Sequence, residues 1–163
     1  MPFFEHDGLN FHYLDKGSGM PFLFQHGLGG DVNQISGLFR PPTGVRLITF
    51  DCRAHGETRP LGNQEKISIA AFTDDLLALM NYLQVDRAII GGISMGAAVA
   101  QNCVLRHPER VMGLVLSRPA WVDRPRPENV AVFSEIAHFI RQHGAKRGQE
   151  MFKIGRASCR ERV

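Results

Sequence analysis

Short runs of apolar residues, spaced along the chain up to residue 116, set the pattern of this sequence. The runs lack the polar alternation of a half-buried strand, which is typical of strands covered on both faces of a parallel sheet. Before them, residues 2–6 and 9–15 flank the turn pair Asp7-Gly8, and this arrangement predicts an antiparallel β-hairpin. The apolar runs are PFLFQ (21–25), VRLITF (45–50), RAIIGG (87–92) and VMGLVL (111–116).

Segments with helical periodicity separate these runs. Phe72, Leu76, Leu79 and Leu83 recur at helical spacing, which predicts a helix that starts at about Ser68, its N-cap, and ends at Leu83. Strands that alternate with helices indicate an α/β fold, namely a three-layer sandwich with a mostly parallel sheet. The other predicted helices cover residues 31–39, 95–106 and 129–143.

The periodic pattern changes at two points near the end of the chain. We expect residues 1–122 to form the N-terminal part of the core and residues 123–153 to begin a helical cap, because a proline-broken loop separates them. Residues 154–163, IGRASCRERV, offer no face to bury and resemble the translation of a common sequencing adapter at every position. We therefore expect a non-biological tail and a reading frame that is cut short.

The composition argues against several classes of function. The net charge is +3, but the tail carries two of these charges, and no basic stripe with interleaved aromatic residues marks a nucleic-acid surface. No apolar run reaches the roughly 18 residues of a membrane span, and the N-terminus lacks a signal peptide, so we expect a cytoplasmic protein. Cys52, Cys103 and Cys159 lie far apart, which indicates neither a disulfide framework nor a zinc site.

The stretch GISMG, residues 92–96, fits the pattern G-x-S-x-G of a nucleophilic serine on a sharp strand-to-helix turn. Ser94 follows an apolar strand and opens a predicted helix, as that turn requires. Gly92 and Gly96 would relieve crowding at the turn. The N–H of Met95, at the start of the helix, would face a developing oxyanion. The alternative is a tight turn whose small residues only pack.

A second oxyanion donor is expected from the loop after the third strand, which is HGLGG at residues 26–30. The N–H of Leu28 is the predicted donor, and His26 and Gly27 would support the loop. Three polar residues follow, and they either line a substrate pocket or form the polar start of a helix: Asp31, Asn33 and Gln34.

Four stretches together resemble the successive landmarks of the α/β-hydrolase fold superfamily. The resemblance spans about residues 3–144 and is specific to the fold rather than to a substrate. DCRAHG resembles the D-x-R-G-H-G loop of the family, with Ala54 in place of the usual glycine, and implies that Asp51, Arg53 and His55 support the site. The four stretches are FLFQHGLGG, ITFDCRAHGET, IIGGISMGAA and HPERVMGLVLSRPAW.

In this family the chain order is serine, then acid, then histidine, and the last two normally follow the seventh and eighth strands. The sequence supplies about six of the eight strands, so the resemblance implies that the triad acid and histidine lie outside this chain. Asp123, after the sixth strand, is the alternative acid. Several histidines belong to other features and none of them is expected to be the base: His26, His55, His107, His138 and His143.

The resemblance implies a serine hydrolase in which Ser94 attacks a carboxylic ester, a lactone or a similar small acyl substrate. This activity is expected of the full-length parent, and the fragment itself is expected to be inactive. Trp121 is a further candidate for the pocket, and no metal or organic cofactor is implied. Two alternatives remain open: a carbon–carbon bond hydrolase or cofactor-free lyase on the same fold, and a non-catalytic fragment or binding protein.

Overall fold

The computed structural model describes residues 2–119, 131–144, 146–148 and 150. The chain divides into two compact units, Met1–Val122 and Asp123–Val163. The first unit contains a β-sheet and the helices that cover it, whereas the second contains α4 (Ala131–His143). The candidate pocket residue Trp121 and the alternative acid Asp123 lie outside the described residues.

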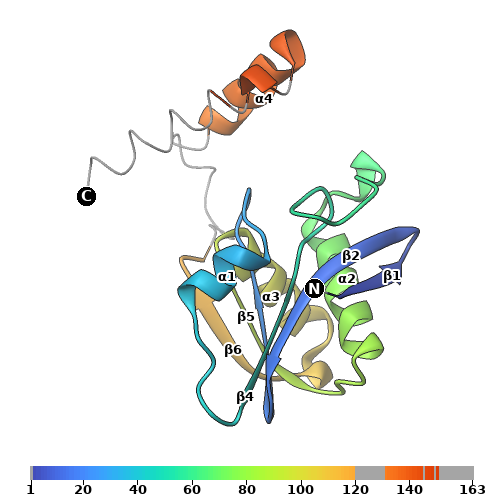
Figure 1. Ribbon diagram of the computed structural model, residues 1–163, viewed down its shortest axis with the longest axis vertical. Coiled ribbons are helices and arrows are strands. Elements are labelled where there is room, and N and C mark those ends of the chain that lie inside the picture. The colour runs from blue at the N-terminus through green and yellow to red at the C-terminus, as the bar shows by residue number, and fades with distance from the viewer. Residues whose placement is uncertain (1, 120–130, 145, 149, 151–163) are drawn as a thin grey trace. The chain divides into compact units, whose positions relative to one another are not determined.

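One six-stranded sheet, with the strand order β1-β2-β4-β3-β5-β6, forms the centre of the first unit (Figure 1). Strands β3, β4, β5 and β6 run parallel, and β2 is antiparallel to both of its neighbours. The predicted sheet, mostly parallel with an antiparallel N-terminal hairpin, is therefore confirmed. The strands are β1 (Phe3–His6), β2 (Leu9–Gly17), β3 (Met20–Gln25), β4 (Val45–Phe50), β5 (Ala88–Ile93) and β6 (Val111–Ser117).

The N-terminal hairpin follows from its turn residues. Asp7 and Gly8 both have a positive φ, 49° and 71°, which gives the turn a twist that matches the twist of the two strands. Strand β2 extends to Gly17, beyond the predicted end at Asp15, because these last residues pair with β4. An ion pair of 2.8 Å between Asp15 and Arg46 also joins the two strands there.

Helices cover both faces of the sheet (Figure 1): α1 (Val32–Leu38) on one face, and α2 (Ile69–Tyr82) and α3 (Met95–Arg106) on the other. Ile48 and Phe50 of β4 belong to the buried cluster that includes α2 and α3. Leu47 points to the opposite face, because side chains alternate along a strand, and it is buried there, as are Val32 and Ile35 of α1. These layers confirm the three-layer sandwich.

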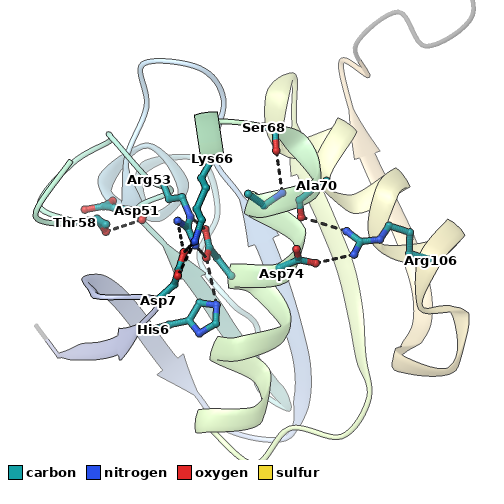
Figure 2. Close-up of polar contacts among 12 residues, drawn as sticks. His6, Asp7, Asp51, Arg53, Thr58, Lys66, Ser68, Ala70, Asp74 and Arg106 are labelled. Atoms are coloured by element: carbon teal, nitrogen blue, oxygen red, sulfur yellow. Dashed lines mark hydrogen bonds and ion pairs between the residues drawn. The ribbon is translucent and has the colours of Figure 1, made fainter. Parts of the chain in front are cut away.

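The ends of α2 and α3 are fixed by side chains (Figure 2). Ser68 is the N-cap of α2, as predicted, and its Oγ accepts a hydrogen bond of 3.2 Å from the N–H of Ala71. Arg106, in the last turn of α3, donates to the Asp74 carboxylate at 2.8 Å and to the Ala70 carbonyl at 3.2 Å. The two helices are therefore joined by polar contacts in addition to their packed apolar faces.

A buried arginine ties the loop after β4 to α2 and to the N-terminal hairpin. The guanidinium of Arg53 donates two hydrogen bonds of 2.7 Å to Asp75, and both side chains are buried. Asp7 accepts 2.8 Å hydrogen bonds from Arg53 and from Lys66 (Figure 2), and these two donors lower the pKa of Asp7 to about 2. The loop is thus fixed at its base from two sides.

Strand β6 is an exposed apolar edge. Met112, Leu114 and Val115 are 48%, 40% and 43% exposed, and the outer side of β6 pairs with no strand within the described residues. The strand carries no proline or charged residue, which are the features that normally protect an edge from pairing with another chain. This edge therefore favours association.

We expect the 163-residue chain to form oligomers or to be poorly soluble because of this edge. Leu114→Lys should shift the chain toward the monomer, since a charged side chain on an edge strand opposes pairing. Leu105→Lys, at a side chain of α3 that is 77% exposed, is the matched control. Size-exclusion chromatography with light scattering measures the mass, and a monodisperse monomer of the unaltered chain would contradict the expectation.

Candidate active site

Ser94 occupies a strained turn between β5 and α3. Its φ of 54° and ψ of −110° lie outside the regions that L-residues normally adopt, at a cost of about 1–3 kcal/mol. The Ser94 N–H donates to the Ser117 carbonyl at 3.0 Å, and the Ser94 carbonyl accepts from the N–H groups of Ala97 and Ala98. These bonds hold the backbone in the strained conformation, and Ser94 itself is exposed.

Two glycines make this turn possible. A Cβ added at Gly92 would overlap the backbone of Gly96, and a Cβ added at Gly96 would overlap the carbonyl group of Gln25 at the end of β3. Both contacts are with backbone atoms, which a rotamer change cannot move. Helix α3 can therefore begin this close to β3 and β5 only if both positions are glycine.

We expect Gly92→Ala and Gly96→Ala each to lower the free energy of unfolding by at least about 2 kcal/mol, because the overlap is with backbone atoms. Gly113→Ala in β6 is the matched control. A Cβ there would meet only the Ile89 side chain, at 3.7 Å and 3.9 Å, so the change should stay below about 1 kcal/mol. Denaturant unfolding measures these differences, and equal effects at all three glycines would contradict the steric argument.

The sheet brings the His26–Gly30 loop to the Ser94 turn. Gln25 and Gly92 are register partners on the neighbouring parallel strands β3 and β5, so both strands end at the same level. A Cβ added at Gly27 would lie 3.6 Å from the Cβ of Ser94. The two motifs, about 65 residues apart in the sequence, are therefore in contact at the carboxyl edge of the sheet.

His26 fixes one peptide plane of this loop. Its Nε2 accepts a 3.0 Å hydrogen bond from the Cys52 N–H, so the ring proton lies on Nδ1 and is donated to the Gly27 carbonyl at 2.8 Å. The Gly30 N–H also donates to that carbonyl, at 2.9 Å. In a trans peptide the C=O of Gly27 and the N–H of Leu28 point in opposite directions, so these bonds also fix the direction of the Leu28 N–H.

Two backbone amides at this place are unused. Within the described residues, neither the Leu28 N–H nor the Met95 N–H donates a hydrogen bond to a protein acceptor. Met95 is the first residue of α3, where the N–H groups lack a partner in the helix and carry partial positive charge. Both amides belong to the elements that meet at Ser94, and this is the arrangement that could bind a negatively charged oxygen.

The environment of His26 keeps its ring neutral. Burial lowers the pKa of His26 to about 4, because the charged imidazolium would lose its hydration. Protonation of Nε2 would also remove the acceptor that the Cys52 N–H requires. His26 is thus a fixed hydrogen-bonding group and not a proton carrier at neutral pH.

This depressed pKa predicts a pH dependence of stability. An unfolded histidine binds a proton below about pH 6.5, whereas folded His26 does so only near pH 4, so the unfolded state binds more protons between these values. His26 should therefore stabilise the fold fully above pH 6.5 and lose about 3 kcal/mol as the pH falls to 4. His26→Gln should flatten this slope in denaturant unfolding measured across pH, and equal slopes would contradict the assignment.

The polar residues after the loop lie at the start of α1. Asp31 is the N-cap, and its carboxylate accepts from the N–H groups of Asn33 and Gln34 at 2.8 Å and 3.2 Å. Asn33 is exposed, and its side chain contacts Asp31 at 3.4 Å. Gln34 instead directs its side-chain oxygen to the Gly27 N–H, at 2.9 Å. Asp31 and Asn33 thus lie in the polar first turn of α1, and the prediction that Asn33 lines a pocket stays a prediction.

Asp51, in the loop after β4, is a buried acceptor for three elements. Its carboxylate accepts from the Val32 N–H at 2.7 Å and from the Glu57 N–H at 2.8 Å, and it contacts Nδ1 of His12 at 2.7 Å. Sequence reasoning missed His12, and the signal that could have found it is a histidine in an apolar strand. These contacts give Asp51 a supporting position beneath the site.

Ala54, in the same loop, has a φ of 60°, in the left-handed region that favours glycine. An alanine here, in place of the glycine of the family loop, therefore raises the conformational energy of the backbone, because its Cβ is crowded in the left-handed region. The Nδ1–H of His55 donates a 2.8 Å hydrogen bond to the Arg53 carbonyl, and the ring of His55 lies 5.0 Å from the ring of His26. His55 belongs to the supporting loop.

Histidines of the first unit are engaged away from Ser94. His12 contacts Asp51, His26 and His55 bond to backbone carbonyls, and His6 lies 3.7 Å from Asp75 (Figure 2). His107 is the C-cap of α3, about 18 Å from Ser94 by the rise of a 12-residue helix. No hydrogen bond joins the Ser94 hydroxyl to another side chain in the part of the chain that the structure describes.

An apolar cleft of about 510 Å³ lies on the face of the sheet that carries α1. Its lining includes Ile93, which precedes Ser94, and Ser117, whose carbonyl accepts the Ser94 N–H, but it does not include Asn33 or Gln34. The lining residues are Phe22, Phe24, Leu38, Phe39, Ile93, Val115, Ser117 and Arg118.

The described residues contain no group of three or more side chains suited to hold a metal ion. Cys52 and Cys103 are buried free thiols, and burial raises both of their pKa values, that of Cys103 to about 11. Among the described helices, none combines the length and apolar character needed to cross a membrane.

Residues 20–151 match the sequence profile of the alpha/beta hydrolase fold family. The match extends over most of the chain and includes both the Ser94 turn and the His26–Gly30 loop. The protein therefore belongs to the alpha/beta hydrolase fold family, as its sheet and its sequence motifs predicted.

Three relatives illustrate this membership. The putative non-heme bromoperoxidase BpoC of Mycobacterium tuberculosis is 34% identical over 113 residues, which are 66% of this chain and 41% of that protein. The structure titled "Est816 as an N-Acyl homoserine lactone degrading enzyme" matches with a TM-score of 0.69 and 29% identity, over 85% of this chain and 54% of Est816. A thermophilic esterase from Thermogutta terrifontis matches with a TM-score of 0.67 and 28% identity, over 83% and 50%. The chain thus spans about half the length of these proteins.

Proposed function

We propose that Ser94 is the nucleophile of a serine hydrolase, and that the whole protein cleaves carboxylic esters, lactones or similar small acyl substrates. The observation that carries this proposal is the backbone of Ser94, with φ 54° and ψ −110°, at an exposed position beside two unused amides. Strain of about 1–3 kcal/mol persists mainly where the function of a site uses it. A turn that only packs would not need it.

The chemistry follows from this geometry. The Oγ of Ser94 attacks the carbonyl carbon of the substrate, and negative charge develops on the carbonyl oxygen. The N–H groups of Leu28 and Met95 stabilise that charge, and each such donor contributes about 10²- to 10³-fold to the rate. Collapse of the tetrahedral intermediate expels the alkoxide and leaves an acyl group on Ser94, which water then removes.

The serine hydroxyl needs a base, because it is a poor nucleophile while it keeps its proton. We propose that a histidine, oriented by an aspartate or glutamate, supplies this base in the whole protein, in the chain order typical of the fold. The histidines of the first unit hold other contacts. Because none of the histidines in the sequence is expected to be the base, we expect the 163-residue chain alone to be inactive.

The choice of acyl substrates is supported by the relatives. Est816 is described as degrading an N-acyl homoserine lactone, and the Thermogutta terrifontis protein is described as an esterase. Both substrates contain a carboxylic ester linkage, which is the group that a nucleophilic serine and an oxyanion site cleave.

Ser94→Ala in the whole protein should lower kcat/KM for a short-chain p-nitrophenyl ester by about 10⁴-fold or more, since the alanine has no nucleophile. It should also abolish labelling by a fluorophosphonate probe. Ser36→Ala, on the surface of α1, is the matched control and should keep the wild-type rate. Absorbance assays and gel fluorescence measure the two effects.

Three outcomes would count against the proposal. The first is a whole protein that cleaves no ester or lactone and ignores the probe, which would favour a non-catalytic role or a carbon–carbon bond reaction. The second is a Ser94→Ala variant that keeps its activity. The third is labelling of Ser94 in the 163-residue chain alone, which would mean that this chain contains a base and would overturn the proposed division of the triad.

A further inference from the structure

The carboxamide of Gln34 lies against the inner side of the His26–Gly30 loop. Its Oε1 accepts the Gly27 N–H at 2.9 Å. A Cβ added at Gly30 would overlap this oxygen and approach the Gln34 Cδ to 2.9 Å, and one added at Gly27 would lie 3.7 Å from the same oxygen. The loop therefore wraps closely around one side chain.

The backbone of Gln34 is itself held in place. Its N–H donates to the Asp31 carbonyl at 3.0 Å and to the Asp31 carboxylate at 3.2 Å, in the first turn of α1. The N–H of Val32, in the same turn, donates to the buried Asp51 carboxylate at 2.7 Å. The start of α1 is thus a fixed base from which the Gln34 side chain reaches the loop.

The hydrogen bond from Gly27 to Gln34 engages one amide of the loop and leaves the next one, the Leu28 N–H, without a partner in the described structure. The Gly27 N–H is occupied by Gln34, and the Gly27 carbonyl is occupied by His26 and Gly30. The Gly27 N–H belongs to the peptide before its Cα and the Gly27 carbonyl to the peptide after it, so these hydrogen bonds hold both peptides and thereby fix φ and ψ of Gly27. The Leu28 N–H is the next amide along the chain and remains free in the described structure.

We infer that Gln34 is a positioning residue of the oxyanion site, which acts through Gly27 to orient the Leu28 N–H, and that it does not line a substrate pocket. This inference rests on the proposed function, because it assigns Leu28 a role in the reaction. Without the acceptor at Gln34, the peptide between His26 and Gly27 loses its partner, φ of Gly27 gains freedom, and the next peptide, which carries the Leu28 N–H, is held only by the bonds to the Gly27 carbonyl. A displacement of about 1 Å at a reacting group can cost roughly 10²-fold in rate.

The contact can be tested in the whole protein without any readout of activity. Gln34→Met keeps the approximate volume and removes the acceptor, whereas Gln34→Glu keeps an oxygen that can accept. Hydrogen exchange of the Gly27 amide, followed by NMR, should become at least about 10-fold faster in Gln34→Met and remain close to wild type in Gln34→Glu. Equal exchange in all three proteins would overturn the contact.

The role is tested in the whole protein with a short-chain p-nitrophenyl ester. Gln34→Met should lower kcat about 10- to 100-fold with KM nearly unchanged, because the oxyanion exists only in the transition state. The affinity for a trifluoromethyl ketone, which forms an oxyanion on the serine, should fall by a similar factor. Gln34→Glu keeps the acceptor but places a carboxylate near the oxyanion, so it should lower kcat as well, while its Gly27 exchange stays close to wild type. Ser36→Ala should change neither kcat nor the affinity.

The outcomes separate this inference from the proposed function. If Ser94→Ala retains activity, the proposed function fails, whatever Gln34 does. If Ser94→Ala is inactive but Gln34→Met keeps the wild-type kcat, only the role of Gln34 is overturned. A rise in KM with kcat unchanged would also overturn it, since that pattern belongs to a pocket residue. If Gln34→Met fails to fold, Gln34→Leu takes its place. The exchange rate of its Gly27 amide is then compared with that of Gln34→Glu, and its kcat with that of the wild-type protein.

Discussion

The close approach of α3 to the ends of β3 and β5 is the constraint on which the rest of the candidate site depends. The gap admits no Cβ at Gly92 or Gly96, because backbone atoms fill it. The turn between the strand and the helix is consequently too sharp for ordinary dihedral angles, and Ser94 takes up the strain. The same geometry aims the first N–H groups of α3 at the position in front of the serine.

A second layer of buried polar groups fixes the loop that faces this turn. His26, Gln34 and Asp51 each satisfy backbone groups that would otherwise be buried without partners or left free to rotate. Stability and the geometry of the candidate site are therefore coupled, since the hydrogen bonds that hold the fold also decide which amide remains unpaired. This coupling explains why buried polar side chains hold the loop and the helix start that form the candidate site.

The proposed nucleophile and oxyanion amides differ from the proposed base in how the fold supplies them. Ser94, Met95 and Leu28 come from two neighbouring strands, so one register between β3 and β5 brings them together. In the proposed mechanism the base comes from another strand end, because each strand of a parallel sheet contributes one loop to the carboxyl edge. The first unit thus holds the strained Ser94 turn, while His12, His26 and His55 form structural contacts.

The sequence by itself determined the strands, the helices and the serine turn, because apolar periodicity and glycine spacing report local backbone geometry. The bounds predicted for β4 and α3, and the Ser68 cap, agree with the structure. Only the tertiary structure decided the partners of the polar side chains. The contact of His12 with Asp51 spans 39 positions, and the acceptor at Gln34 depends on how the loop folds back over α1. Such contacts follow from the register of strands and the path of loops, which no local pattern encodes.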